Sequence, residues 1–433
     1  MIKIAVIGIG YVGLPLARLF STKYPVIGYD INLKRINELN NCKDSLNELS
    51  KNIIKKVLVN KNPLNNNFKK GLYFTNNLSD IKQANIYVIT IPTPIYKNKK
   101  PDLRLLFKAT RDVGKFLNKK DIVIYESTVY PGLTEEECVP ILEKESKLIF
   151  NKNFFVGYSP ERINPGDKKR TIDKILKITS GSNKKTALEI DKLYKSVIKA
   201  GTYLAPSIKI AEAAKIIENT QRDINIAFIN ELSKIFNLLN INTNEVLKAA
   251  STKWNFLNFK PGLVGGHCIG VDPYYLSKKS QYLGYNPKII LAGRKINDSM
   301  GEYVVSQVIK LMIKKNIKIK KSKVLILGIA FKENCNDIRN SKVFDIIKNF
   351  EEYDIKTTIF DPLVLPSLVK ENKNKIKNLN FNNIYKKNKY DAIVLAVNHI
   401  QFKTFKYKEN LKKNSVLYDV KRVLKNKNID GGL

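Results

Sequence analysis

The sequence predicts an α/β protein with two doubly wound parallel sheets, joined by a long central helix and a helical middle domain. Three observations predict this class. Short apolar strands alternate with helical stretches in the first half of the chain, the same alternation returns near the C-terminus, and a long helical segment separates the two sets. Because strands separated by crossover segments pair in parallel, each set is typical of a doubly wound sheet. We expect the 433 residues to divide into domains at 1–203, 204–300 and 317–433.

The predicted strands are short apolar runs bounded by turn residues. They are Lys3–Ile7, Pro25–Tyr29, Ile86–Ile91, Ile122–Tyr125 and Phe154–Gly157 in the first set, and Lys323–Leu327, Lys356–Phe360, Ala392–Ala396 and Val416–Tyr418 in the second. From Ser207 to about Asn240 the chain has no Gly or Pro, and apolar residues recur at helical spacing. Ser207 is the predicted N-cap. Such a helix suits a domain connector and an oligomer interface; the alternative is a surface helix that breaks along its length.

The charge is strongly basic, with 76 Lys and Arg against 39 Asp and Glu, a net charge of +37. Such a balance is typical of a nucleic-acid binder or of a general preference for lysine. Lysines occur in every segment, so we favour the second interpretation and expect no nucleic-acid partner. We expect no membrane segment, because no apolar run reaches the ~18 residues that a spanning helix needs. The N-terminus lacks signal-peptide features and the four cysteines form no CxxC pair, so we expect a cytoplasmic protein.

Residues 8–13 read Gly-Ile-Gly-Tyr-Val-Gly, a GxGxxG motif between a predicted strand and a predicted helix. The first glycine permits a tight turn, the second lets a pyrophosphate approach the backbone, and the third lets helix and strand pack closely. The helix N-terminus offers free N–H groups and a positive dipole end to the phosphates. This context predicts a Rossmann-like dinucleotide site. Its candidate contacts are Gly8, Gly10, Tyr11, Val12 and Gly13.

Asp30 ends the next predicted strand, 17 residues after Gly13. A carboxylate there accepts hydrogen bonds from ribose hydroxyls and repels a 2′-phosphate, so NAD is favoured over NADP. Arg35 either stacks near the adenine or is a solvated helix residue. Thr93 and Thr128 follow strands that end at the same sheet edge, where ligands of open α/β sheets bind; the alternative is that they are turn residues.

The stretch 261–273 gathers glycines around one cysteine, Cys268, with Asp272 shortly after it. Glycines let the backbone approach a ligand closely, although an isolated cytosolic cysteine is often a small core residue. His267 and Cys268 are adjacent and point opposite ways in an extended chain, so we do not favour a Cys–His dyad. The second histidine is His399, and no zinc-ligand spacing occurs, so we expect no metal.

Four polar residues on the long predicted helix share one face: Glu212, Lys215, Asn219 and Arg222. Small neighbours such as Ala211 and Ala214 allow close approach to this face. It is either a solvated stripe or the polar wall of a cleft between domains.

These motifs together resemble the UDP-glucose/GDP-mannose dehydrogenase family, nearly end to end and in order. The resemblance rests on GxGxxG with Asp30, YSPERI at 158–163, Lys215 with Asn219, GGHCIGVDPYYL at 265–276, and Phe331-Lys332 with Arg339. The chain is most similar to the branch that oxidises UDP-N-acetylhexosamines for surface polysaccharides of the Vi-antigen type.

The resemblance implies a twofold oxidation of the C6 hydroxyl of a UDP-N-acetylhexosamine, UDP-GlcNAc or UDP-GalNAc, to the uronic acid with two NAD. By analogy the Cys268 thiolate adds to the intermediate aldehyde, and the thiohemiacetal is oxidised to a thioester that water hydrolyses. Alternatives are UDP-glucose or UDP-ManNAc as substrate, a single two-electron NAD dehydrogenase acting for example on hydroxy acids, and a basic nucleic-acid-binding protein.

The other catalytic residues are carried over from the family motifs. Lys215 matches the lysine that stabilises oxyanion charge or moves protons, and Asn219 would hold the same oxygen. Asp272 matches the carboxylate that orders water and carries protons together with Thr128 and Glu161.

The resemblance also implies a C-terminal domain that binds UDP. Lys332 and Arg339 would pair with the diphosphate, whereas Lys421 is either a third such cation or an ordinary surface lysine. The loop before Lys332 is not a GxGxxG, which argues against a second dinucleotide. Lys253 corresponds to a residue that reaches into a neighbouring subunit in relatives, and we expect a homodimer. The implied substrate contacts are Glu161, Arg162, Ile163, Lys215, Asn219, Arg222, Lys253, Gly265, Phe331, Lys332, Arg339 and Lys421.

Overall fold

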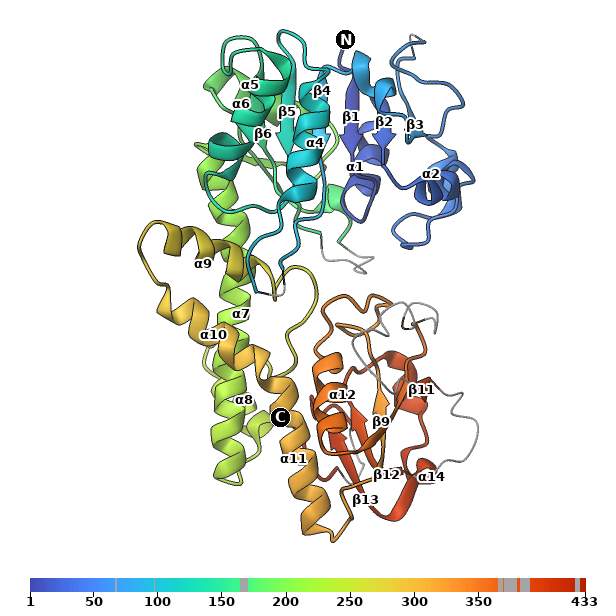
Figure 1. Cartoon of the computed structure of the whole chain (residues 1–433), viewed down its shortest axis with the longest axis vertical. Coiled ribbons are helices and arrows are strands. Elements are labelled where there is room, and N and C mark those ends of the chain that lie inside the picture. The colour runs from blue at the N-terminus through green and yellow to red at the C-terminus, as the bar shows by residue number, and fades with distance from the viewer. Residues whose placement is uncertain are drawn as a thin grey trace. The chain divides into compact units, whose positions relative to one another are not determined.

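The computed structural model describes residues 1–66, 68–96, 98–163, 170–364, 369, 380–381, 390–424 and 429–433. The chain forms two compact units. The first comprises Met1–Glu218 with Tyr274–Gly284, and the second comprises Asn219–Pro273 with Tyr285–Leu433. Each unit contains a sheet flanked by helices (Figure 1), so the predicted α/β class with two Rossmann-like sheets is confirmed.

In the described part of the chain, the first unit is built on a six-stranded parallel sheet of order β3-β2-β1-β4-β5-β6. Ile4 of β1 lies opposite Val26 on one side and Ile86 on the other. From β1 the next strands are added toward one edge of the sheet, and from β4 onward they are added toward the other edge. Open parallel sheets bind ligands outside the strand ends at the point where the strand order reverses in this way. The strands are β1 (Ile4–Ile7), β2 (Pro25–Tyr29), β3 (Gly71–Thr75), β4 (Ile86–Ile89), β5 (Ile122–Tyr125) and β6 (Phe155–Tyr158).

Both faces of this sheet are buried under helices. Ile4 and Val6 of β1 face a cluster that includes side chains of α1 and α6, whereas Ala5 and Ile7 face a cluster with α4 and α5. Strand side chains alternate between faces, so a sheet covered on both sides needs the continuous apolar runs that the sequence shows. The helices are α1 (Gly13–Phe20), α2 (Leu33–Asn40), α3 (Lys51–Lys55), α4 (Arg104–Gly114), α5 (Val139–Ser146) and α6 (Lys184–Lys195).

Some short strands were not predicted. They are β3, the small parallel pair β7 (Lys177–Thr179) and β8 (Thr202–Leu204), and β11 (Asn380–Phe381). Strands of two or three residues are too short to show a period, and β3 begins at Gly71, whose φ is +136°. Several predicted strands differ from the observed ones by a few residues at their ends.

The long helix α7 (Ile208–Leu238) confirms the predicted central helix. Ser207 caps it, because its Oγ accepts a hydrogen bond from the N–H of Ile210 at 3.2 Å. The helix begins in the first unit and ends in the second. The helices that follow are α8 (Thr243–Ala250), α9 (Asp272–Tyr282), α10 (Lys288–Asp298) and α11 (Met300–Lys314).

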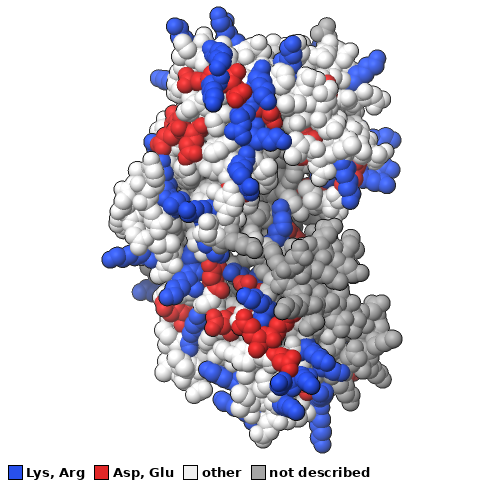
Figure 2. Space-filling model, viewed as in Figure 1, with Lys and Arg blue, Asp and Glu red and all other residues white. Residues whose placement is uncertain are grey.

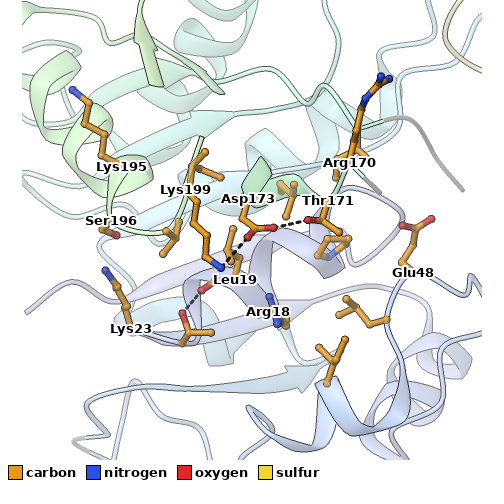
Figure 3. Close-up of a pocket in the computed structure, with 18 of the residues that line it drawn as sticks. Arg18, Leu19, Lys23, Glu48, Arg170, Thr171, Asp173, Lys195, Ser196 and Lys199 are labelled. Atoms are coloured by element: carbon orange, nitrogen blue, oxygen red, sulfur yellow. Dashed lines mark hydrogen bonds and ion pairs between the residues drawn. The ribbon is translucent and has the colours of Figure 1, made fainter. Parts of the chain in front are cut away.

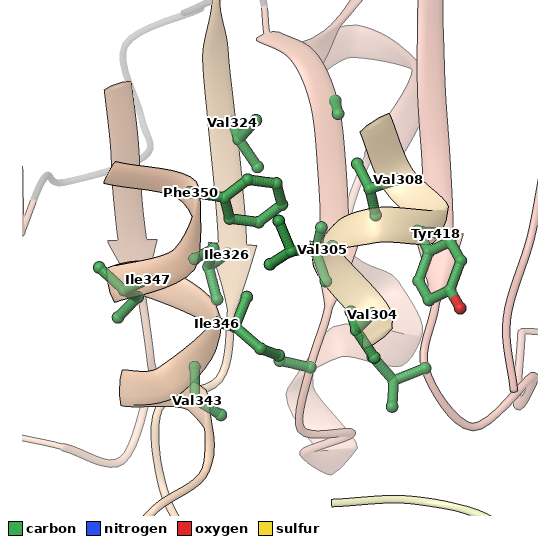
Figure 4. Packing of buried hydrophobic residues seen from close by; sticks show 14 of the residues in the cluster. Val304, Val305, Val308, Val324, Ile326, Val343, Ile346, Ile347, Phe350 and Tyr418 are labelled. Atoms are coloured by element: carbon green, nitrogen blue, oxygen red, sulfur yellow. The ribbon is translucent and has the colours of Figure 1, made fainter. Parts of the chain in front are cut away.

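The second unit contains, among its described residues, a five-stranded parallel sheet of order β11-β10-β9-β12-β13. Val304, Val305 and Val308 of α11 pack with Ile346 and Phe350 of α12 against this sheet (Figure 4). This packing forms the largest part of the unit's core. The elements are β9 (Lys323–Leu327), α12 (Val343–Glu352), β10 (Lys356–Phe360), β12 (Tyr390–Leu395), α14 (Tyr407–Asn410) and β13 (Leu411–Asp419).

The surface is basic without one concentrated basic patch on the visible face. Figure 2 shows Lys and Arg scattered over that face with Asp and Glu between them. This distribution does not favour a nucleic-acid footprint, which gathers cations along one groove or stripe. All four cysteines are free thiols. The described helices include none that is both long and apolar enough to cross a membrane.

Candidate active site

The glycine turn after β1 has the geometry that a dinucleotide needs. Gly8 adopts φ +95°, and a Cβ on Gly13 would stand 1.9 Å from the carbonyl oxygen of Gly8. Gly10, by contrast, has open space around its missing Cβ. Tyr11 and Val12 are partly exposed, and no side chain caps the N-terminus of α1. The open space at Gly10 therefore lies at the N-terminal, positive end of the α1 dipole, where a pyrophosphate binds, and the residues fit NAD.

Asp30 lies beside this turn at the end of β2. Its Oδ2 accepts the N–H of Ile9 at 2.8 Å and its Oδ1 accepts the N–H of Asn32 at 2.9 Å, and further lone pairs remain for a ribose. Arg35 is buried. Its Nε donates to the carbonyl of Ile9 at 3.0 Å, and its guanidinium pairs with Asp44 at 2.7 Å. The solvated alternative for Arg35 is thus wrong, and its contact with the adenine stays a prediction.

The two threonines predicted at the sheet edge are brought together. Thr93 Oγ1 donates to the carbonyl oxygen of Thr128 at 2.7 Å. Ser127 reinforces the link by donating to the carbonyl of Ile91 at 2.7 Å. The loops after β4 and β5 therefore form one surface at the strand ends, which is where the ligands of such sheets bind.

Glu161 lies just after β6 with both carboxylate oxygens engaged. Oε1 accepts the N–H groups of Arg162 and Ile163, each at 2.6 Å, and Oε2 lies 3.2 Å from the ammonium of Lys177. The Arg162 guanidinium pairs with Glu218 at 2.8 Å. These bonds fix the carboxylate in one orientation, as a general base or water-ordering group requires.

Lys177 is a residue that the sequence reasoning missed. Its ammonium is buried and also lies 2.7 Å from Glu126, which in turn accepts a short hydrogen bond from the Tyr194 hydroxyl. Burial, opposed by Lys177, raises the pKa of the Glu126 carboxyl to about 7. The available signal was a charged residue inside the apolar run Leu176–Ile178, but its partner Glu126 lies 51 positions away in the chain.

The polar face of α7 is not a solvated stripe at its start. Glu212 is buried and accepts the N–H groups of Gly132 at 2.6 Å and Thr134 at 3.0 Å. Lys215 is 8% exposed, and its ammonium has no hydrogen-bond or ion-pair partner among the described residues. A buried cation without a partner suits an anionic group of a substrate or intermediate. Arg222, farther along the helix, is exposed.

Cys268 belongs to the second unit and is partly exposed, so it is not a fully buried core residue. Its carbonyl oxygen accepts the N–H groups of Val271 at 2.9 Å and Asp272 at 2.8 Å, which closes a tight turn before α9. Asp272 Oδ2 accepts a hydrogen bond from the Asn219 amide of α7 at 2.6 Å. The structure therefore places the Asn219 amide against Asp272, the residue that closes the cysteine turn.

The cysteine turn packs on the C-terminal domain. Gly266 adopts φ +85°, and a Cβ there would stand 2.8 Å from the ring of Phe331. A Cβ on Gly265 would stand 2.6 Å from the carbonyl oxygen of Asn340, so neither position accepts a side chain without movement. The His267 ring meets Phe331 edge-on, with centroids 5.8 Å apart. The turn thus lies directly against the loop that carries the predicted UDP contacts.

Two of the three predicted diphosphate cations are held by carboxylates. Arg339 makes a bidentate pair with Asp337, with Nη2 at 2.6 Å from Oδ2, and the ammonium of Lys421 bonds Glu333. Lys421 is thus partly exposed and ion-paired, and its contact with a diphosphate stays a prediction. The ammonium of Lys332 lies 5.4 Å from the ring centroid of Phe331. A diphosphate would compete with Asp337 for the guanidinium of Arg339.

A second glycine turn, at Gly328, follows β9. Asp361 at the end of β10 accepts the N–H groups of Ile329 at 2.7 Å and Ala330 at 3.2 Å, much as Asp30 holds the first turn. Here the carboxylate is buried under His399, whose Nε2 lies 3.0 Å from Asp361. His399 Nδ1 accepts the N–H of Asn334 at 2.9 Å, so Nε2 carries the proton and donates to Asp361.

A cavity of about 670 Å³ lies elsewhere in the first unit, between α1, the end of α6 and residues 170–173 (Figure 3). Lys199 pairs with Asp173 at 3.5 Å on its wall. Among the predicted site residues, Ile163 alone belongs to the described lining. The cavity is therefore distinct from the glycine turn.

The fold and the first site define the class: an NAD-dependent dehydrogenase with a second nucleotide-binding domain. The chain belongs to the UDP-glucose/GDP-mannose dehydrogenase family. The family's NAD binding domain matches residues 2–198, its central domain matches 209–299 and its UDP binding domain matches 325–426. NAD is thus the cofactor. No group of three or more His, Cys, Asp or Glu in the described part of the chain is placed to hold a metal ion.

Several known proteins are similar over nearly the whole chain. A UDP-N-acetyl-D-glucosamine 6-dehydrogenase of Salmonella typhi is 54% identical over 426 residues, 98% of this chain and 96% of its own length. Another with the same name, from Pseudomonas aeruginosa, is 52% identical over 98% of this chain and 97% of its own. The solved UDP-D-ManNAc dehydrogenase of Pyrococcus horikoshii has a TM-score of 0.86 at 29% identity, covering 100% of this chain and 99% of that chain.

Proposed function

We propose that this protein oxidises the C6 hydroxyl of a UDP-N-acetylhexosamine, UDP-GlcNAc or UDP-GalNAc, twice to the uronic acid, in the cytoplasm and for polysaccharide biosynthesis. The names of the relatives at 54% and 52% identity support the substrate class. The observation that carries the chemistry is the position of the cysteine turn: the partly exposed Cys268 follows glycines that pack on Phe331 of the UDP binding domain.

Two oxidations need a covalent step between them. NAD, when bound, accepts a hydride in each oxidation. The first oxidation removes a hydride and a proton from the C6 alcohol and leaves an aldehyde. The Cys268 thiolate then adds to the aldehyde carbon, and the thiohemiacetal loses a second hydride and a proton to become a thioester. Water cleaves the C–S bond, which releases the carboxylate and restores the thiol.

The remaining roles are those that the family resemblance implies, and hydrogen bonds and burial support them. Lys215, buried without a partner among the described residues, stabilises the developing oxyanion, and Asn219 holds the same oxygen. Glu161 and Asp272, each fixed by hydrogen bonds, order water and carry protons together with Thr128. The contacts proposed for Arg162, Ile163, Lys332 and Arg339 are with the nucleotide sugar.

The NADH yield tests this function. Purified protein with NAD and a panel of UDP-GlcNAc, UDP-GalNAc, UDP-ManNAc and UDP-glucose should form close to two NADH per molecule of one UDP-N-acetylhexosamine. A yield close to one NADH would support the single two-electron dehydrogenase instead. Best turnover of UDP-glucose or UDP-ManNAc would keep the reaction and correct the substrate.

Cys268→Ala separates binding from the covalent step. The variant should bind NAD and UDP with the wild-type affinities and form no uronic acid, because no thiohemiacetal can form. The products are identified by mass spectrometry, and Cys335→Ala, also a partly exposed cysteine of the second unit, is the control. Normal uronic acid from Cys268→Ala would end the thioester mechanism.

We propose in addition that the protein is a homodimer with three domains at 1–203, 204–300 and 317–433. Apolar side chains are exposed along one face of α7, among them Phe228 at 54% and Leu238 at 81%, and Trp254 next to Lys253 is 91% exposed. Exposed apolar patches of this kind are typical of protein interfaces. Lys253 would then reach a neighbouring subunit, as the family resemblance implies.

A further inference from the structure

We propose that Lys177 is a positioning residue for the reaction. Its ammonium, anchored by Glu126 and Tyr194, holds the Glu161 carboxylate in one orientation. This inference rests on the proposed function, because Glu161 matters there as a group that orders water and moves protons. All four residues lie in the first unit and are buried.

The geometry gives Lys177 two carboxylates and no other described ion-pair partner. Its Nζ lies 2.7 Å from Glu126 Oε2 and 3.2 Å from Glu161 Oε2, and 5.5 Å from the centroid of the Tyr194 ring. Burial alone would lower the pKa of Lys177, but the two carboxylates outweigh it and raise that pKa. The ammonium is therefore charged throughout the neutral range.

The anchoring comes from three different elements. Lys177 is on β7, Glu126 follows β5, and Tyr194 is on α6, where its hydroxyl bonds the second oxygen of Glu126. Glu161 follows β6, and its other oxygen is held by two backbone N–H groups. The ammonium is thus the single described side-chain donor to Glu161, and it cannot shift without breaking its bond to Glu126.

The charge balance explains why the lysine matters for proton transfer. One ammonium faces two carboxyl groups in a buried site, and it opposes the burial that raises the pKa of Glu126, with the Arg162 guanidinium paired to Glu218 nearby. Without the ammonium, Glu126 and Glu161 would face each other as like charges in a poorly hydrated site. One of them would then take up a proton, which removes the acceptor that a base needs.

Lys177→Met tests the inference through pH and through the split between kcat and KM. We expect kcat to fall about 100-fold while KM for the UDP-sugar changes less than about threefold. The acidic limb of the pH profile should move to higher pH by about one unit, because the pKa of the remaining carboxylate pair rises. Lys184→Met, on the exposed surface of α6, is the matched control and should behave as wild type.

Two further variants separate orientation from charge. Lys177→Arg keeps the charge and should keep the wild-type acidic limb and recover most of kcat. Lys177→Met combined with Glu126→Gln restores the charge balance but not the bond to Glu161, so the acidic limb should return while kcat stays low. NAD affinity and thermal midpoint, measured on each variant, show that the first unit is folded.

The possible failures are distinguishable. If the wild type oxidises no UDP-sugar, the proposed function fails and this inference falls with it. If the wild type is active and Lys177→Met has the same kcat and pH profile, only the role of Lys177 is wrong. Full recovery of kcat in the double variant would also overturn the positioning role. If Lys177→Met does not fold, a displaced acidic limb in the folded Lys177→Arg variant would contradict the inference in the same way.

Discussion

At the scale of single residues, Gly10 and Gly13 are required for different reasons. Gly13 has no space for a side chain, because a Cβ there would meet the carbonyl of Gly8, whereas Gly10 has open space where the pyrophosphate would lie. A side chain at Gly10 should therefore affect cofactor binding alone, whereas a side chain at Gly13 should affect both stability and cofactor binding.

We predict that Gly10→Ala keeps the thermal midpoint within about 1 °C of wild type and weakens NAD binding at least about tenfold, since the methyl group occupies the place of the ligand. Gly13→Ala should weaken NAD binding and also lower the midpoint by several degrees, roughly what 1–3 kcal/mol of overpacking causes. Calorimetry with NAD and thermal melts measure both. Equal stability losses in the two variants would contradict the distinction.

Most of the candidate site could be predicted from local sequence motifs. The rest depends on contacts between residues that lie far apart in the sequence, which local motifs do not reveal. The carboxyl ends of the parallel strands carry the predicted residues Gly8, Asp30, Thr93 and Thr128. For Arg35 the sequence leaves stacking and solvation both open, because its partners Ile9 and Asp44 become neighbours only after folding. Lys177 could not be assigned a role from the sequence, because its counterion Glu126 is identified only by the folded structure.

At the scale of elements, the loop after β9 depends on a buried histidine. His399 joins Asp361 to the N–H of Asn334, and Asp361 holds the start of the same loop. The loop carries Lys332, so its shape sets where that cation can meet a diphosphate.

We predict that His399→Leu weakens UDP binding about tenfold and leaves NAD affinity unchanged, because it removes one buried and one partly buried hydrogen bond from the second unit alone. Titration calorimetry with UDP and with NAD on the same preparation gives both values. Gln401→Ala, at an exposed neighbouring position, serves as the control. Wild-type UDP affinity in His399→Leu would show that the loop is held by other contacts.

Element prediction succeeded where periodicity is long. The 31 residues of α7 and the buried runs of β2, β5, β9 and β10 were found because burial on one or both faces imposes a clear pattern. The single pair formed by β7 and β8 could not be predicted, because strands of three residues show no hydrophobic period. Their positions are set by tertiary bonds such as Ser159 Oγ to the carbonyl of Ile178 at 2.7 Å.

At the scale of the whole molecule, the proposed dimer is the prediction to test first. Phe228, Ile235 and Leu238 lie at helical spacing on α7 and are exposed. We predict that Phe228→Glu combined with Leu238→Glu halves the mass in solution, from twice 49.5 kDa to the mass of one chain. Light scattering after gel filtration measures it. Leu188→Glu, an exposed leucine on α6, should stay dimeric, and an unchanged mass in the double variant would locate any interface elsewhere.

The buried carboxylate of Asp361 also has a bearing on inhibitor design. Asp30 and Asp361 hold similar turns, but one remains partly open while the other is sealed beneath an imidazole. A compound that mimics adenosine by offering two vicinal hydroxyls would find an acceptor at the first turn and none at the second. Such an adenosine mimic should therefore prefer the first turn to the second.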